Sequence, residues 1–147
     1  MSVHANETLV RQFYAAFNNR KFDEATRLAS DKFEWRDVAT GETYRGPAGM
    51  RQFIERWVNA FGDAKLDITR VVVSDQFFAA ELLGRGTHSG ALETPGGSIA
   101  PTNRKIELPC CEVGMIENGK IRSGSTYYDA ATIMQQLGVT EMAGSHR

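Results

Sequence analysis

Apolar side chains recur at helical spacing in the first part of this chain. Residues 7–17 place five of them on one helix face, namely Leu9, Val10, Phe13, Tyr14 and Phe17. Asn6 precedes this run and is the expected N-cap. A shorter helix is predicted over 22–28, and a third begins at Pro47 and runs to Phe61, with Gly62 closing it.

The rest of the chain mostly alternates between apolar and polar positions, as strands do. This pattern predicts strands over 31–38, 66–74, 76–88, 105–117 and 120–128, with tight turns at Ser74-Asp75 and Asn118-Gly119. Residues 41–46 indicate a turn or short hairpin, and residues 89–103 an exposed loop beside a cavity. A short last helix begins near Ala130. We expect an α+β fold in which three N-terminal helices pack on a curved, mostly antiparallel sheet that closes as a cone.

Length and composition narrow the function classes. The 147 residues suit one domain over 1–147, with an ordered core at about 6–138. The formal net charge of −1 gives no basic surface for nucleic acid, so a small apolar molecule is the expected partner. We see neither a secretory signal nor a membrane segment. Adjacent Cys110 and Cys111 cannot easily pair, which favours the reducing cytoplasm.

Three polar residues are candidates for catalysis. Asp129 follows the last strand and shares a face with Ser125 and Tyr127, so it is a general acid/base if that face lines a cavity, or else the N-cap of the next helix. His88 ends a strand with a small, apolar face, where it assists by hydrogen bonding or satisfies the adjoining loop. Asp37 lies on the face of Trp35, as a second base or as the start of a turn.

The expected cavity wall is largely aromatic, which suits a flat apolar ligand. The candidate substrate-binding residues are Tyr14, Phe17, Trp35, Trp57, Phe61, Cys111, Met115 and Tyr127. The three histidines, His4, His88 and His146, form no cluster, so we expect no metal site.

Several motifs, in this order, resemble the SnoaL-like polyketide cyclases of the nuclear transport factor 2 (NTF2)-like superfamily. They are Tyr44–Pro47, Gly86–Gly90, Pro101–Arg104, Gly119–Ile121, Tyr128–Asp129 and Met134–Gly138. The resemblance implies that Asp129 is the general acid/base of an intramolecular aldol ring closure, that no cofactor is used, and that the protein is a homodimer. The superfamily's ketosteroid isomerases place their base where Asp37 stands, whereas their acidic oxyanion donor would fall near Cys111. That mismatch speaks against isomerase activity.

Two functional hypotheses follow. The first is a cofactor-independent cyclase or isomerase that removes a proton next to a carbonyl of an apolar substrate. The second is a domain that binds a small apolar ligand, or pairs through its sheet, without catalysis. Neutralising Asp129, Asp37 and His88 separates them, because an enzyme would lose turnover and a binding domain would keep its affinity.

Overall fold

The computed structural model describes residues 2–139 of the chain. Its helices are α1 (Val3–Asn18), α2 (Phe22–Arg27), α3 (Gly46–Ala60) and α4 (Ala130–Leu137). Its strands are β1 (Ala29–Asp37), β2 (Glu42–Arg45), β3 (Lys65–Val73), β4 (Phe77–Thr87), β5 (Leu92–Thr94), β6 (Gly97–Ile99), β7 (Lys105–Glu117) and β8 (Lys120–Tyr128). His146 and the last residues of the expected domain lie outside the described residues.

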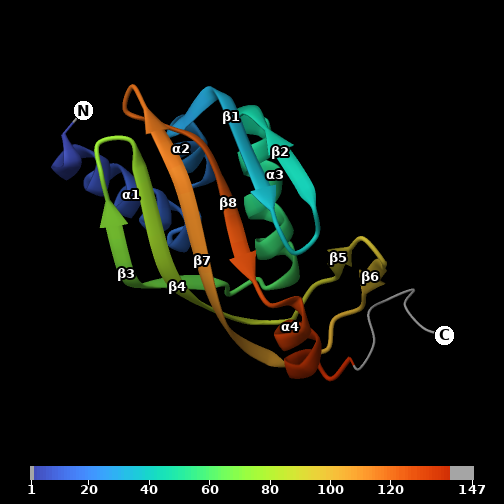
Figure 1. The fold of residues 1–147 in the computed structure, drawn as a ribbon. Coiled ribbons are helices and arrows are strands. Elements are labelled where there is room, and N and C mark those ends of the chain that lie inside the picture. The colour runs from blue at the N-terminus through green and yellow to red at the C-terminus, as the bar shows by residue number, and fades with distance from the viewer. Residues whose placement is uncertain (1, 140–147) are drawn as a thin grey trace.

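Strands β1 to β4, β7 and β8 form one six-stranded sheet in the order β2-β1-β8-β7-β4-β3. Neighbouring strands are antiparallel except β1 and β8, which are parallel. Helices α1, α2 and α3 lie together on one side of the curved sheet, and α4 follows β8 at its lower end (Figure 1). The predicted α+β fold, with three helices packed on a curved, mostly antiparallel sheet, is confirmed, although β1 and β2 come between α2 and α3.

Helix α1 begins earlier than the apolar pattern predicts. Ser2 is its N-cap and accepts a hydrogen bond at 3.0 Å from the amide of Ala5. The expectation that Asn6 caps this helix was therefore wrong. Asn6 is buried inside the helix, and its amide nitrogen donates to the carbonyls of Ser74 and Asp75, at 3.1 and 3.0 Å. It ties α1 to the turn between β3 and β4.

The stretch predicted as a loop contains a short hairpin. Strands β5 and β6 pair within residues 92–99, and Leu92 and Ile99 are buried. They pack in an apolar cluster with Phe61 and with Ile133 and Met134 of α4. The loop expectation missed this hairpin because two apolar residues among many small polar ones carry little periodic signal.

The sheet has an inner face against the helices and an outer face. On β7 and β8 the inner positions include Glu112, Gly114, Gly124 and Thr126, all of which contact or support the core. Gly114 and Gly124 are paired in the ladder, and the space above them is filled by Phe78 and Trp35. In the described residues, no helix is long and apolar enough to cross a membrane.

Candidate functional site

A mostly apolar cavity lies between the helices and the inner face of the sheet. Its wall includes Phe17, Trp57 and Phe61, as predicted, together with Phe13, Phe53, Leu66, Ile106 and Leu108. The cavity measures about 80 Å³. Drug-sized ligands usually occupy roughly 300 to 1,000 Å³, so in this conformation the cavity suits a small, one-ring ligand better than a polycyclic one.

Glu112 of β7 brings a carboxyl group into this apolar wall. Its side chain is buried, and the hydroxyl of Tyr14 donates to Oε1 at 2.7 Å while that of Thr126 donates to Oε2 at 2.6 Å. Burial raises the pKa of Glu112, and these two hydrogen bonds oppose the rise. None of the ion pairs among the described residues involves Glu112, so no neighbouring cation offsets the effect of burial, and its pKa lies above the ordinary value.

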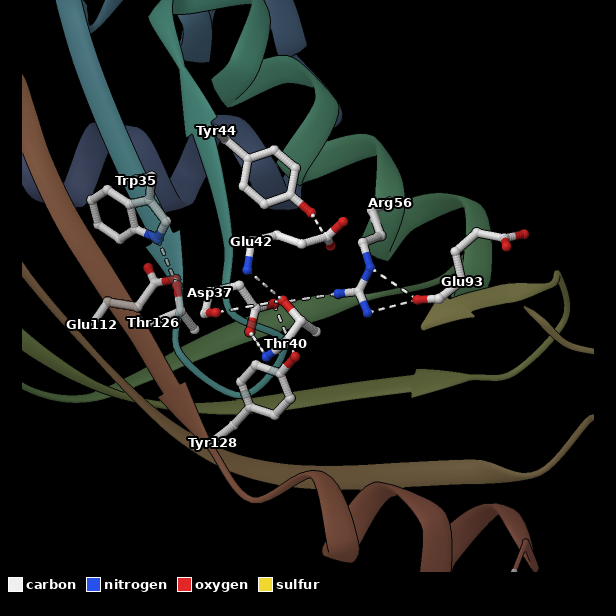
Figure 2. A network of polar contacts seen from close by, with 10 residues as sticks. All are labelled: Trp35, Asp37, Thr40, Glu42, Tyr44, Arg56, Glu93, Glu112, Thr126 and Tyr128. Carbon is white, nitrogen blue, oxygen red and sulfur yellow. Dashed lines mark hydrogen bonds and ion pairs between the residues drawn. The ribbon is translucent and has the colours of Figure 1, made fainter. Parts of the chain in front are cut away.

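Two residues expected to touch the ligand instead hold Glu112. Tyr14 reaches it from α1, and burial together with the neighbouring Glu112 raises the pKa of the Tyr14 phenol well above its usual value. Trp35 donates its indole N–H to the Thr126 hydroxyl at 2.7 Å, and that hydroxyl passes the next hydrogen bond to Glu112. Figure 2 shows Trp35, Thr126 and Glu112 in this order.

Asp37 forms a second buried group at the end of β1. Its Oδ2 accepts a hydrogen bond from the Tyr128 hydroxyl at 2.9 Å and lies 3.4 Å from Nη1 of Arg56. Its Oδ1 accepts the amide of Thr40 at 3.2 Å, which is the turn bond that the sequence offered as an alternative. Tyr128 and Arg56 converge on Asp37 in Figure 2. Asp37 thus starts the turn and also anchors Tyr128, whose ring lines the cavity.

His88 is buried outside the cavity wall. Its Nδ1 accepts the amide of Thr102 at 3.1 Å, which places the proton on Nε2, and Nε2 has no partner among the described residues. Its ring lies 5.4 Å from that of Phe61, and burial lowers the pKa of the imidazole. These contacts match the expected loop-bonding role of His88.

Asp129 caps α4 and is exposed to solvent. Its carboxylate accepts the amide of Ala131 at 2.9 Å and the hydroxyl of Thr132 at 3.1 Å. It lies beside an open groove on the outer face of the sheet, together with Cys111 and Tyr127. Of the two expectations for Asp129, the contacts match the cap.

Cys111, Met115 and Tyr127 were expected to line the cavity, and that placement was wrong. All three lie on the outer face, Cys111 and Tyr127 in one groove and Met115 in another. Alternation had grouped them correctly, but it was the opposite group that faces the helices. The inward cysteine is Cys110, and burial raises the pKa of its thiol to about 12, which disfavours a thiolate nucleophile.

Four site residues escaped the sequence prediction: Glu112, Thr126, Tyr128 and Arg56. A signal for Glu112 was present, because it is the single acid in the row Ile106, Leu108, Cys110, Glu112, Gly114 and Ile116. An acid on an apolar strand face needs buried partners, which makes it a site candidate. No comparable signal marks Arg56, whose partner Asp37 comes from another element.

The comparisons with known proteins agree with this fold. The protein TsrD from Streptomyces laurentii superposes with a TM-score of 0.80 at 22% identity, over 95% of this chain and 98% of that one. IdmH from Streptomyces antibioticus, a candidate polyketide cyclase, superposes with a TM-score of 0.73 at 24% identity, over 90% of this chain and 98% of that one. A protein from Catenulispora acidiphila with a ketosteroid isomerase-like fold, in complex with trimethylamine, has a TM-score of 0.74 at 18% identity, over 89% of this chain and 92% of that one.

At these low sequence identities, the similarity to the solved structures shows the fold and nothing more. No curated protein sequence matches the chain. The model of the SnoaL-like polyketide cyclase family, however, matches residues 8–137, which include most of α1, the other three helices and the whole six-stranded sheet. This chain therefore belongs to the SnoaL-like polyketide cyclase family.

Proposed function

We propose that this protein is a cofactor-independent catalyst that moves a proton at a carbon next to a carbonyl group, in an aldol ring closure or a related isomerisation of a small apolar molecule. The observation that carries the proposal is Glu112, a buried carboxyl group in an apolar cavity wall. Membership in the cyclase family supports the general class of reaction.

Glu112 is suited to acid/base chemistry because of its surroundings. Desolvation raises its pKa, and a carboxyl group whose pKa lies closer to neutrality exchanges protons with a carbon acid more effectively. Its two oxygens are held by Tyr14 and Thr126, so the group does not have to reorganise before it acts. In its ionised form it would accept the substrate proton, and in its neutral form it would return it.

This proposal moves the acid/base role from Asp129 to Glu112. Asp129 is exposed, and its carboxylate accepts hydrogen bonds from the first turn of α4. Glu112, in contrast, is buried in the wall of the cavity. Asp37 does not line the cavity, but it accepts a hydrogen bond from Tyr128, which does, and we give it a supporting role. His88 has no part in the proposed chemistry.

The test uses the exchange of hydrogen for deuterium next to the carbonyl of cyclohexanone, which fits a small cavity. In heavy water, the exchange that depends on the protein is followed by NMR for the wild type, Glu112→Gln and Asp129→Asn. We expect Glu112→Gln to lose about 10² to 10⁴-fold of this exchange, the usual contribution of a general acid/base. Asp129→Asn should keep it.

The other outcomes are equally informative. If Glu112→Gln exchanges at the wild-type rate, Glu112 is not the acid/base group. If only Asp129→Asn loses exchange, the assignment returns to Asp129. If the wild type binds cyclohexanone, as read from its tryptophan fluorescence, but exchanges nothing, the protein is a ligand-binding member of the family and not a proton-transfer catalyst.

A further inference from the structure

Tyr128 is the one phenol in the described cavity wall. Its ring meets Trp57 edge-on, with centroids 5.3 Å apart, and its hydroxyl donates to Asp37 at 2.9 Å. The ring is therefore fixed at both ends. The hydroxyl hydrogen is not, because it can rotate about the C–O bond toward any acceptor within reach.

Asp37 would stay satisfied if that hydrogen turned away. Its Oδ2 keeps the Arg56 guanidinium at 3.4 Å, and its Oδ1 keeps the Thr40 amide at 3.2 Å. Neither oxygen would be left buried and unpaired, which is the costly outcome for a polar group. Glu112 differs, since each of its oxygens has one hydrogen-bond donor among the described residues.

Arg56 is held independently of Tyr128 by groups that do not depend on a ligand. Its Nη2 and Nε donate to the carbonyl of Glu93, at 2.8 and 3.2 Å, and its guanidinium lies 4.7 Å above the ring of Trp57. Its side chain is only 11% exposed. Because β5 supplies the Glu93 carbonyl, the β5–β6 hairpin keeps the cation beside Asp37.

We propose that Tyr128 binds the carbonyl oxygen of the substrate, and that Arg56 is a positioning residue that holds Asp37 while the Tyr128 hydroxyl turns from Asp37 to that oxygen. The proposal rests on the proposed function, because it takes the ligand to be a carbonyl compound. Glu112 and Tyr128 both line the cavity. The backbone of Tyr128 lies two positions along β8, about 7 Å at strand spacing, from that of Thr126, which bonds Glu112. A small ketone in this cavity is therefore placed to contact both residues.

The experiment measures binding and not turnover. Cyclohexanone labelled at its carbonyl carbon is titrated to saturation, and the carbon NMR shift of the bound carbonyl is compared with that of the free ketone. A hydrogen bond to the oxygen moves this resonance downfield. We expect Tyr128→Phe to remove most of the movement, and Tyr44→Phe to keep it, since the Tyr44 hydroxyl bonds Glu42 in another groove.

Arg56 is tested by the same shift. Arg56→Gln should reduce the movement although Tyr128 is intact, and Arg56→Lys should restore part of it. A purely structural role would weaken binding but leave the shift of the saturated complex unchanged. Because Tyr128→Phe keeps the ring and Arg56→Gln keeps the phenol, misfolding of one variant leaves the other as a test.

The proposal is overturned if the bound carbonyl does not shift in the wild type, or if Tyr128→Phe leaves the shift unchanged. Loss of the shift in Glu112→Gln with retention in Tyr128→Phe would also overturn it, by assigning the oxygen to Glu112. Failure of the proposed function looks different: deuterium exchange is absent while the carbonyl shift still responds to Tyr128→Phe.

Discussion

The inner and outer faces of the β7–β8 pair carry the same kinds of residue and put them to different uses. Each face holds an acid and a tyrosine: Glu112 with Tyr128 inside, and Asp129 with Tyr127 outside. Inside, Glu112 is buried and its pKa is raised. Outside, Tyr127 is 47% exposed and Asp129 caps a helix. The comparison teaches that burial by the helices, and not residue type, makes a carboxyl group a candidate for acid/base chemistry.

The largest expected effect on stability comes from a substitution that disrupts packing on the inner face. A side chain at Gly124 would press on the Trp35 ring and lie 2.5 Å from the carbonyl oxygen of Val113. Gly124→Ala should therefore lower the free energy of unfolding by about 3 kcal/mol, at the upper end for overpacking. Ser125→Ala, the next residue on the outer face, is the control and should change little. Urea unfolding measures both, and equal losses would mean that the two faces are not distinguished by packing.

A second prediction compares Tyr14, which bonds Glu112 on the inner face, with Tyr127 on the outer face. Tyr14→Phe leaves Oε1 of buried Glu112 without its donor, so the free energy of unfolding should fall by about 2 kcal/mol. Tyr127→Phe removes a hydroxyl from the outer face and should cost close to nothing. Thermal and urea unfolding compare the pair. A Tyr14→Phe variant as stable as the wild type would show that the bond to Glu112 contributes no net stability.

A third prediction follows from the raised pKa of Glu112. Above the ordinary value of 4.5, the unfolded chain releases the Glu112 proton while the native state keeps it. Stability therefore falls as pH rises, by up to about 1.4 kcal/mol per pH unit, until the native group also ionises. Relative to Glu112→Gln, the wild type should lose stability with rising pH from 4.5 upward. Parallel pH profiles of the two proteins would contradict the raised pKa.

A fourth prediction addresses the outer acid. Asp129→Ala removes the cap of α4 and should lower the free energy of unfolding by about 1 kcal/mol. Asp129→Asn should keep most of that stability, because asparagine is also a good cap. Both variants should bind cyclohexanone as the wild type does. A loss of binding in Asp129→Asn would show that the outer acid reaches the ligand after all.

The smallest expected effect on the folded monomer concerns the outer surface. Phe77, Val113 and Val72 are exposed apolar residues there, and the expected homodimer remains a prediction. Val113→Asp should change the free energy of unfolding of the monomer by less than about 0.5 kcal/mol, yet weaken self-association through this face. Val38→Asp, similarly exposed elsewhere, is the control. Sedimentation velocity that shows the same species for all three proteins would rule out pairing through this surface.

Local patterns determined most of the fold. The spacing of apolar residues placed α1, α3 and the long strands within a few positions of their observed bounds, because a helix face and a strand face each have one period. The same periodicity correctly grouped Phe33, Trp35 and Asp37, all of which are buried. It also grouped Cys111, Val113 and Met115, and these are on the outer face.

Only the tertiary structure decided which group faces the cavity, and with it the site. The alternation of side chains along a strand indicates which residues share a face, but it does not indicate which face the helices cover. Tyr14 lies 98 residues from Glu112 in the chain, and Tyr128 lies 91 residues from Asp37. Such contacts depend on how α1, α3 and the sheet pack together. The sequence by itself therefore determined the long helices and strands, the fold class and Asp37 as a candidate, while packing selected Glu112 and Tyr128.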